Sequence, residues 1–84
     1  MLNDNEIEKE LNAFEKWFKN SVKRDQIIYY TGFLASDLID EHEIVQIRAA
    51  KIKDYFNYLY ESNYVTLTQR KLNDDVYQYI AIRI

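Results

Sequence analysis

Catalytic chemistry has few candidate residues in this sequence, and the single histidine is the first of them. His42 lies among Asp40, Glu41 and Glu43, and a neighbouring carboxylate can raise the pKa of an imidazole. No cysteine and no nucleophile at a motif spacing accompanies this histidine, so a solvated turn residue is the simpler interpretation. We therefore expect that the protein is not an enzyme.

Metal and cofactor chemistry is not predicted either. The chain has no second histidine, and residues 40–43 lack the spacing and the glycine of a calcium-binding loop. One glycine in the whole sequence is too few for a phosphate-binding loop or a dinucleotide fingerprint. We expect no bound metal and no cofactor.

DNA recognition is a second kind of chemistry, and it needs a helix whose first turns reach base edges while basic groups hold phosphates. The longest helical pattern runs from about residue 40 to residue 62. On its outward side, Gln46 suits a bidentate contact with adenine, and Ala50 is small enough to contact a thymine methyl group. The full set of candidate DNA contacts is Thr31, Gln46, Arg48, Ala50, Lys51, Lys53, Arg70 and Lys71.

Several members of this set would hold phosphates. Thr31 and nearby backbone amides would do so at the start of a short helix. Arg48 flanks the apolar stripe, where its side chain either covers the core or reaches a phosphate. Arg70 and Lys71 approach a hairpin tip and could reach an adjacent groove or backbone. Because these cations are few, we expect weak affinity for DNA with a shallow salt dependence. Tight binding would then require a homodimer.

A protein interface competes for the same elements. Ile47 and Tyr58 are apolar or aromatic side chains on the outward side of the long helix, and Asp74 and Asp75 place negative charge at the hairpin tip. Exposed aromatic and apolar groups among mixed charges are typical of protein interfaces. The two remaining tyrosines of the long helix that flank this side, Tyr55 and Tyr60, are expected to be partly buried.

Composition indicates one small domain over residues 1–84 with a single core. Hydrophobic residues make up 48% of the chain, and the formal net charge is −3. Residues 25–45 hold five acids and no base, whereas residues 46–84 hold six bases and four acids. No stretch approaches the roughly 20 apolar residues of a membrane span, so we expect a cytoplasmic protein that does not contact a membrane.

The periodicity of apolar residues places these candidates on six elements. Helices are predicted at about residues 5–22, 33–39 and 40–62, and strands at about 26–30, 64–70 and 76–83. Capping boxes are predicted at Asn5 with Glu8 and at Asp40 with Glu43, and Thr31 is the predicted N-cap of the short helix. The last two strands form a hairpin, and the short first strand pairs with it. The fold class is therefore α+β.

Two segments carry a resemblance to a known group of proteins. YYTGFLASD (residues 29–37) and TLTQRKL…YQYIAIR (residues 66–83) resemble the small winged-helix proteins of phages and prophages. The resemblance implies a winged helix with a small antiparallel sheet, DNA binding and a role in transcription regulation. Tyr30 departs from the histidine common in such proteins, and Asn73-Asp74-Asp75 replaces the usual glycine of the wing.

Two functional hypotheses follow. The first is a winged-helix regulator of a phage or prophage, acting on double-stranded DNA as a homodimer through the long helix. The second is a winged-helix interaction module that binds a protein partner, as an inhibitor or adaptor, and does not bind DNA. The acidic balance of the chain and the outward positions of Ile47 and Tyr58 motivate the second hypothesis.

Overall fold

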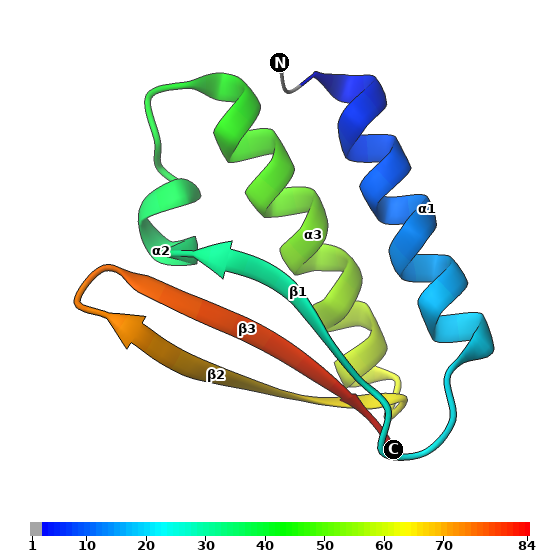
Figure 1. Cartoon of the computed structure of the whole chain (residues 1–84). Coiled ribbons are helices and arrows are strands. Elements are labelled where there is room, and N and C mark those ends of the chain that lie inside the picture. The colour runs from blue at the N-terminus through cyan, green and yellow to red at the C-terminus, as the bar shows by residue number, and fades with distance from the viewer. Residues whose placement is uncertain (1–2) are drawn as a thin grey trace.

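A computed structural model describes residues 3–84, and these residues form three helices and three strands (Figure 1). The elements are α1 (Asp4–Asn20), β1 (Gln26–Gly32), α2 (Leu34–Asp37), α3 (Glu43–Glu61), β2 (Val65–Asn73) and β3 (Val76–Arg83). All strands pair antiparallel in the order β1-β3-β2. The α+β class, the order of elements along the chain and the hairpin are confirmed.

The first helix begins earlier than its predicted start. Asn3 is the N-cap, and its side-chain oxygen accepts a hydrogen bond from the backbone N–H of Glu6 at 3.0 Å. The predicted capping box at Asn5 and Glu8 is therefore wrong, and the cap lies two residues earlier. The chain has asparagine at both position 3 and position 5, and either could have capped the helix. Ile7 and Phe14 are buried on the predicted apolar stripe of α1.

A bulge in β1 brings two successive tyrosines into the core. The register of β1 on β3 shifts between Ile28 and Tyr30, so that one extra residue is accommodated in β1. Side chains of a regular strand alternate between faces, but here Tyr29 and Tyr30 are both buried on the helix side. β1 also extends to Gly32, two residues beyond its predicted end.

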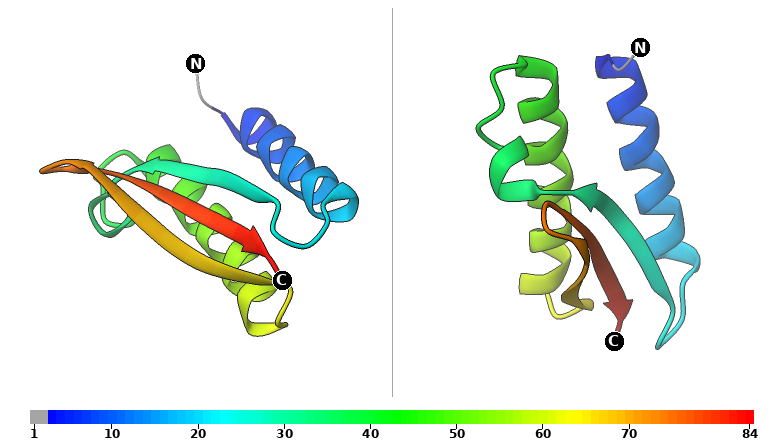
Figure 2. Two further views of the ribbon diagram at one scale, coloured as in Figure 1. Left: turned by 60° about the horizontal axis from the view of Figure 1, so that its bottom comes forward. Right: turned by 60° about the vertical axis from the view of Figure 1, so that its left-hand side comes forward.

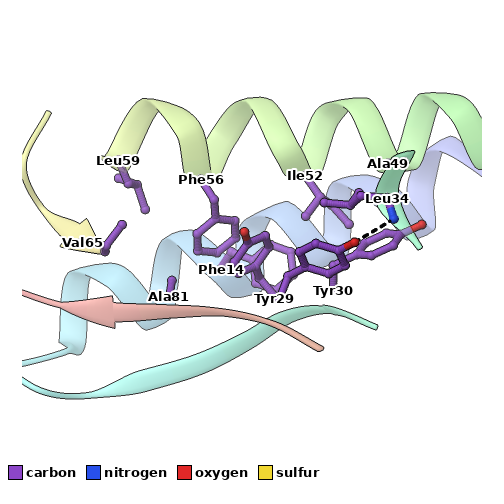
Figure 3. Close-up of a cluster of buried hydrophobic side chains, with 11 residues drawn as sticks. Phe14, Tyr29, Tyr30, Leu34, Ala49, Ile52, Phe56, Leu59, Val65 and Ala81 are labelled. Atoms are coloured by element: carbon purple, nitrogen blue, oxygen red, sulfur yellow. Dashed lines mark hydrogen bonds between the residues drawn. The ribbon is translucent and has the colours of Figure 1, made fainter. Parts of the chain in front are cut away.

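The hydrophobic core lies between α3, α1 and the sheet (Figure 3). Apolar residues spaced three and four positions apart along α3 are buried in it, as the helical periodicity of residues 40–62 predicts: Ala49, Ile52, Phe56 and Leu59. The fully buried ring of Phe56 stacks on Tyr29, with centroids 4.2 Å apart, and meets the ring of Phe14 edge-on at 5.1 Å. This aromatic cluster joins a residue from each of three elements.

The connection between α2 and α3 differs from its prediction. α2 has only four residues, and α3 begins at Glu43 after His42, whose side chain makes no capping hydrogen bond. Asp40 instead accepts a hydrogen bond from the backbone N–H of His42 at 2.7 Å. The predicted capping box of Asp40 and Glu43 is therefore wrong, because Asp40 uses its carboxylate to close the turn before the helix.

The helices and the sheet form two layers. α1 and α3 lie on the same face of the sheet, and α2 lies at one end of it beside α3 (Figure 2). None of the helices described in residues 3–84 covers the opposite face of the sheet (Figure 2). The positions that alternate with the buried residues of β3, such as Ile80 and Ile82, therefore lie on an open face.

Candidate functional site

Arg48 is bound by α1. Its Nε and Nη2 atoms donate to the two carboxylate oxygens of Glu10 at 2.9 and 3.0 Å, and its guanidinium lies 5.0 Å from the ring centroid of Tyr30. The hydrogen bonds to Glu10 raise the pKa of Arg48 above its ordinary value, against the opposing effect of burial. The guanidinium thus joins α1, α3 and β1. Of the two alternatives predicted for Arg48, covering the core or reaching a phosphate, the structure shows the first.

Lys51 also faces α1. Its Nζ lies 3.4 Å from a carboxylate oxygen of Glu8, and both side chains remain about half exposed. Two of the cations predicted to contact DNA from the long helix are therefore paired with glutamates of the neighbouring helix. Any phosphate contact by Arg48 or Lys51 would have to compete with these carboxylates.

Thr31 does not begin a helix. It lies within β1, opposite Gln78 of β3, and the N-cap of α2 is Phe33. The prediction that Thr31 caps the short helix is wrong, because the strand continues through Gly32 and leaves α2 too short to bind a phosphate at its start. The hydroxyl of Thr31 is instead on an exposed part of the sheet edge.

A hydrogen bond between Tyr30 and Asp37 ties β1 to α2. The hydroxyl of Tyr30 donates to Oδ2 of Asp37, and the buried hydroxyl of Tyr79 accepts from the backbone N–H of Leu34 at 3.1 Å. Burial is the largest cause of a raised pKa at Tyr30, and the hydrogen bond to Asp37 adds to it. These contacts are structural, because both tyrosine hydroxyls are directed into the protein.

The turn around His42 has no arrangement suited to catalysis. Nδ1 of His42 lies 2.9 Å from Oδ1 of Asp40. The pKa of Asp40 is lowered, mainly by the hydrogen bond from the backbone N–H of His42 and also by the one from its side chain. The His42 side chain is exposed to solvent. Within residues 3–84, no group of three His, Asp or Glu side chains is placed to bind a metal ion.

The outward stripe of α3, defined here as Glu43, Ile47, Ala50, Asp54 and Tyr58, faces away from the sheet. Tyr58 is 61% exposed, whereas Ile47 and Ala50 are half-buried. Both charged members, Glu43 and Asp54, are exposed acids. The acid Glu43 begins the stripe and the acid Asp54 lies between Ala50 and Tyr58, so the stripe combines apolar and acidic residues and contains no base.

The remaining candidates of the long helix lie beside this stripe. Gln46 and Lys53 are half-buried, on the side of α3 away from α1. Of the two flanking tyrosines, Tyr55 is half-buried with its ring edge-on to Phe56 at 5.3 Å. Tyr60 is exposed, so the prediction of its partial burial is wrong.

The hairpin carries both signs of charge near its tip. Arg70 and Lys71 are exposed on β2, and Nζ of Lys71 lies 4.0 Å from a carboxylate oxygen of Asp74. The carboxamide oxygen of Asn73 accepts from the backbone N–H of Asp75 at 3.1 Å, which closes the turn without glycine. The two basic side chains and the two acidic ones are thus within one short segment.

A hollow of about 340 Å³ opens between α1 and β1. Its lining includes Ala13, Phe14 and Tyr29, together with the Arg48–Glu10 pair. The charged groups in the hollow already neutralise each other through two hydrogen bonds. Among the residues that line the hollow, Arg48 and Glu10 are the charged ones, so the hollow presents no unpaired charge to a small molecule.

The open face of the sheet is the surface that sequence patterns did not single out. Ile28 is 49% exposed on it, and Ile80 and Ile82 are half-buried. The signal that could have indicated it is the sequence of β3, VYQYIAIR, which is apolar at both alternating sets of positions. A strand with one solvated face usually alternates apolar and polar residues.

Comparisons with protein-family models, with curated proteins and with solved structures find no match to this chain. Among the helices of residues 3–84, none has the length and the apolar character that crossing a membrane requires.

Proposed function

We propose that this chain is a winged-helix interaction module that binds a protein partner through the outward stripe of α3 and does not read DNA. The order of elements, with a short helix before the long one and a closing hairpin, supports a winged helix. The strand order β1-β3-β2 agrees with it. The observation that carries the functional proposal is the pairing of Arg48 and Lys51 with glutamates of α1.

Electrostatics at the start of α3 opposes insertion into a DNA groove. A recognition helix presents its first turns to base edges between two rows of phosphates. Here those turns are preceded by Asp40 and Glu41 and begin with Glu43, and Asp54 follows farther along the outward stripe. With Arg48 and Lys51 directed to α1, no cation on that stripe offsets the repulsion between these carboxylates and phosphates.

The same stripe has the composition of a protein contact. Ile47 and Ala50 form an apolar group that is flanked along the helix by Glu43 and Asp54, and Tyr58 adds an aromatic side chain one turn beyond Asp54. Protein interfaces combine an apolar, aromatic-rich centre with a polar rim, and tyrosine is prominent among residues that contribute most to binding. A partner with basic groups around an apolar contact would complement this surface.

Site-specific photocrosslinking tests this proposal. A photoreactive phenylalanine analogue replaces Tyr58 in one variant, and exposed Val22 in a matched control variant. We expect one defined partner to crosslink from position 58 and not from position 22. Asp54→Lys in the Tyr58 variant is expected to reduce crosslinking at least tenfold, because the partner would then meet a like charge.

Fluorescence anisotropy with random duplex DNA at low salt provides the opposing measurement. We expect wild type to bind more weakly than about 10⁻⁴ M, the weak limit of non-specific binding by true DNA-binding proteins. Tighter binding that is lost in a Lys53→Glu and Arg70→Glu double variant would contradict the proposal.

DNA binding by a transcription regulator remains the second candidate function, and one observation favours it. Lys53 and Arg70 form no ion pair within residues 3–84, and Lys71 pairs only with Asp74 of its own hairpin. If these three cations contacted phosphates, the salt dependence of binding would have a log–log slope of about −0.9 for each contact. Glu10→Gln would then strengthen binding by freeing Arg48.

A further inference from the structure

The face of the sheet turned away from the helices has an apolar centre. Ile80 and Ile82 lie on it because Tyr79 and Ala81, which alternate with them in β3, are buried on the helix side. Ile28 of β1 lies opposite Ile80 in the register of the sheet and is 49% exposed. Such an exposed apolar patch usually marks an interaction surface.

The residues around this centre are uncharged. Thr68 and Thr66 of β2 lie opposite Ile80 and Ile82, and Gln26 of β1 lies opposite Ile82 on the other side. Among the outward positions of the strands, the one charge belongs to Arg70, which lies toward the hairpin tip. In a chain with 30% charged residues, a nearly charge-free face is a local departure from the average.

We propose that two copies of this chain associate through this open sheet face, packed sheet on sheet about a twofold axis close to Ile80. An interface with twofold symmetry places each patch against an identical patch, so it must be complementary to itself. An apolar face whose centre has no charge satisfies this condition, because no pair of like charges is brought together and no unpaired charge is buried. Two sheets packed in this way lie about 10 Å apart.

The size of the face suits a weak dimer. The face is three strands wide and its central strand β3 has eight residues, so it measures roughly 26 by 14 Å. Two such faces in contact form an interface smaller than the roughly 1,200 Å² of standard size, in the range of weak complexes. A second copy is also the occupant whose sheet matches this face in length and width. We therefore expect dimerisation to depend on protein concentration, with the dimer forming between about 0.1 and 1 mM, as weak interfaces of this size do.

The arrangement has a consequence for the long helices. Because α3 covers the opposite side of each sheet (Figure 2), the outward stripes of the two copies would point away from each other. A dimeric helix-turn-helix protein places both recognition helices on one side of the DNA, about one helical turn apart. A sheet-to-sheet dimer would instead present two separate partner surfaces, although a monomer could still bind a partner through α3.

Sedimentation and small-angle scattering over a range of concentrations test the dimer. The radius of gyration of one copy is 12.8 Å over Cα atoms, and packing two copies sheet on sheet would raise it to about 16 Å. We expect Ile80→Glu to yield a monomer at concentrations where wild type is dimeric. Ile39→Glu, an equal change at a highly exposed apolar residue outside the face, should leave the dimer intact.

Thr68→Lys provides a second variant in case Ile80→Glu disturbs folding, because Thr68 is exposed and adjacent to Ile80 in the sheet. Circular dichroism checks the fold of each variant. The chain has no cysteine, so Thr68→Cys also allows a single spin label, and a label-to-label distance below about 40 Å is expected for sheets packed about 10 Å apart. The proposal is overturned if wild type stays monomeric at millimolar concentration, or if a dimer persists in Thr68→Lys. Either result leaves crosslinking from Tyr58 unaffected.

Discussion

Gly32 is the single glycine of the chain, and its surroundings explain why a side chain is not accommodated there. Its φ of +147° is rarely adopted by other residues. A Cβ atom at this position would lie 3.1 Å from Oδ2 of Asp37 and 3.3 Å from the ring of Tyr30. The glycine thus permits the hydrogen bond between Tyr30 and Asp37, which joins β1 to α2.

Gly32→Ala is expected to destabilise the protein by about 1–3 kcal/mol, because it combines an unfavourable φ with crowding of the Tyr30–Asp37 contact. Urea unfolding followed by circular dichroism measures the change. Ser36→Ala, at an exposed position of α2, is the control and should change the free energy of unfolding by less than about 0.5 kcal/mol. An unchanged midpoint for Gly32→Ala would contradict this account of the glycine.

Alkaline pH is expected to weaken the fold through its buried tyrosines. Burial, with a smaller effect of Tyr79, raises the pKa of Tyr29 from 10.0 to about 12, and the pKa of Tyr30 is raised as well. An unfolded tyrosine titrates near pH 10. Above that pH the unfolded chain loses protons that the folded chain keeps, so the full stability is present below about pH 10 and is lost as pH rises toward 12.

Urea unfolding at pH 8 and at intervals from pH 9.5 to pH 11.5 measures this loss. We expect the free energy of unfolding to fall less between pH 8 and pH 11 in Tyr29→Phe than in wild type, because the variant lacks one buried hydroxyl that titrates. A decline of equal slope in both proteins would show that Tyr29 does not contribute.

Single-residue predictions succeeded where a rule of backbone geometry applied. A lone glycine between a strand and a helix indicates a close approach or a positive φ, and Gly32 has both. The capping role of Thr31 was wrong because strand pairing with Gln78 competes with a cap, and that pairing depends on residues 47 positions away. The α1 partners of Arg48 and Lys51 are also remote in sequence, 38 and 43 positions away, so no local spacing indicates them.

At the scale of elements, two ion pairs join α1 to α3, and they differ in their surroundings. The Arg48–Glu10 pair is partly buried and forms two hydrogen bonds. The Lys51–Glu8 pair is about half exposed, with a single contact of 3.4 Å. Bidentate geometry and partial burial strengthen an ion pair, whereas solvent weakens an exposed one.

Double-mutant cycles with Arg48→Met and Glu10→Gln, and with Lys51→Met and Glu8→Gln, compare the two pairs. We expect a coupling energy of about 1–2 kcal/mol for Arg48 with Glu10 and of about 0.2–0.5 kcal/mol for Lys51 with Glu8. Added salt should reduce the second coupling more than the first. Equal couplings would indicate that Arg48 is not the main link between the helices.

The elements themselves were accessible from sequence because their periodicities are strong. The stripe of α3 contains Ile52 and Phe56 at the expected spacing, and the bounds of β3 are those predicted. The α2–α3 connection was less predictable, because Asp40 can either cap a helix or close a turn. The face of β3 that meets the helices could not be derived either, since both of its faces are apolar.

At the scale of the whole molecule, we expect affinity for DNA to depend more on where charges lie than on the net charge. The outward stripe of α3 carries Glu43 and Asp54, and the hairpin tip carries Asp74 and Asp75. Replacing either pair with lysines takes the formal net charge from −3 to about +1 at pH 7, because each replacement changes the charge by two. The two double variants therefore match in net charge and differ only in where the new cations lie.

Anisotropy with random duplex DNA at low salt distinguishes them. If α3 has the position of a recognition helix but the wrong charges, Glu43→Lys with Asp54→Lys should gain affinity at least tenfold over Asp74→Lys with Asp75→Lys. The gain should fall with salt, because it arises from the release of counterions from phosphates. Equal gains in both variants would mean that net charge alone governs binding and that α3 has no special access to DNA. Tight binding by wild type itself would contradict the view that carboxylates on α3 direct this protein toward a protein partner.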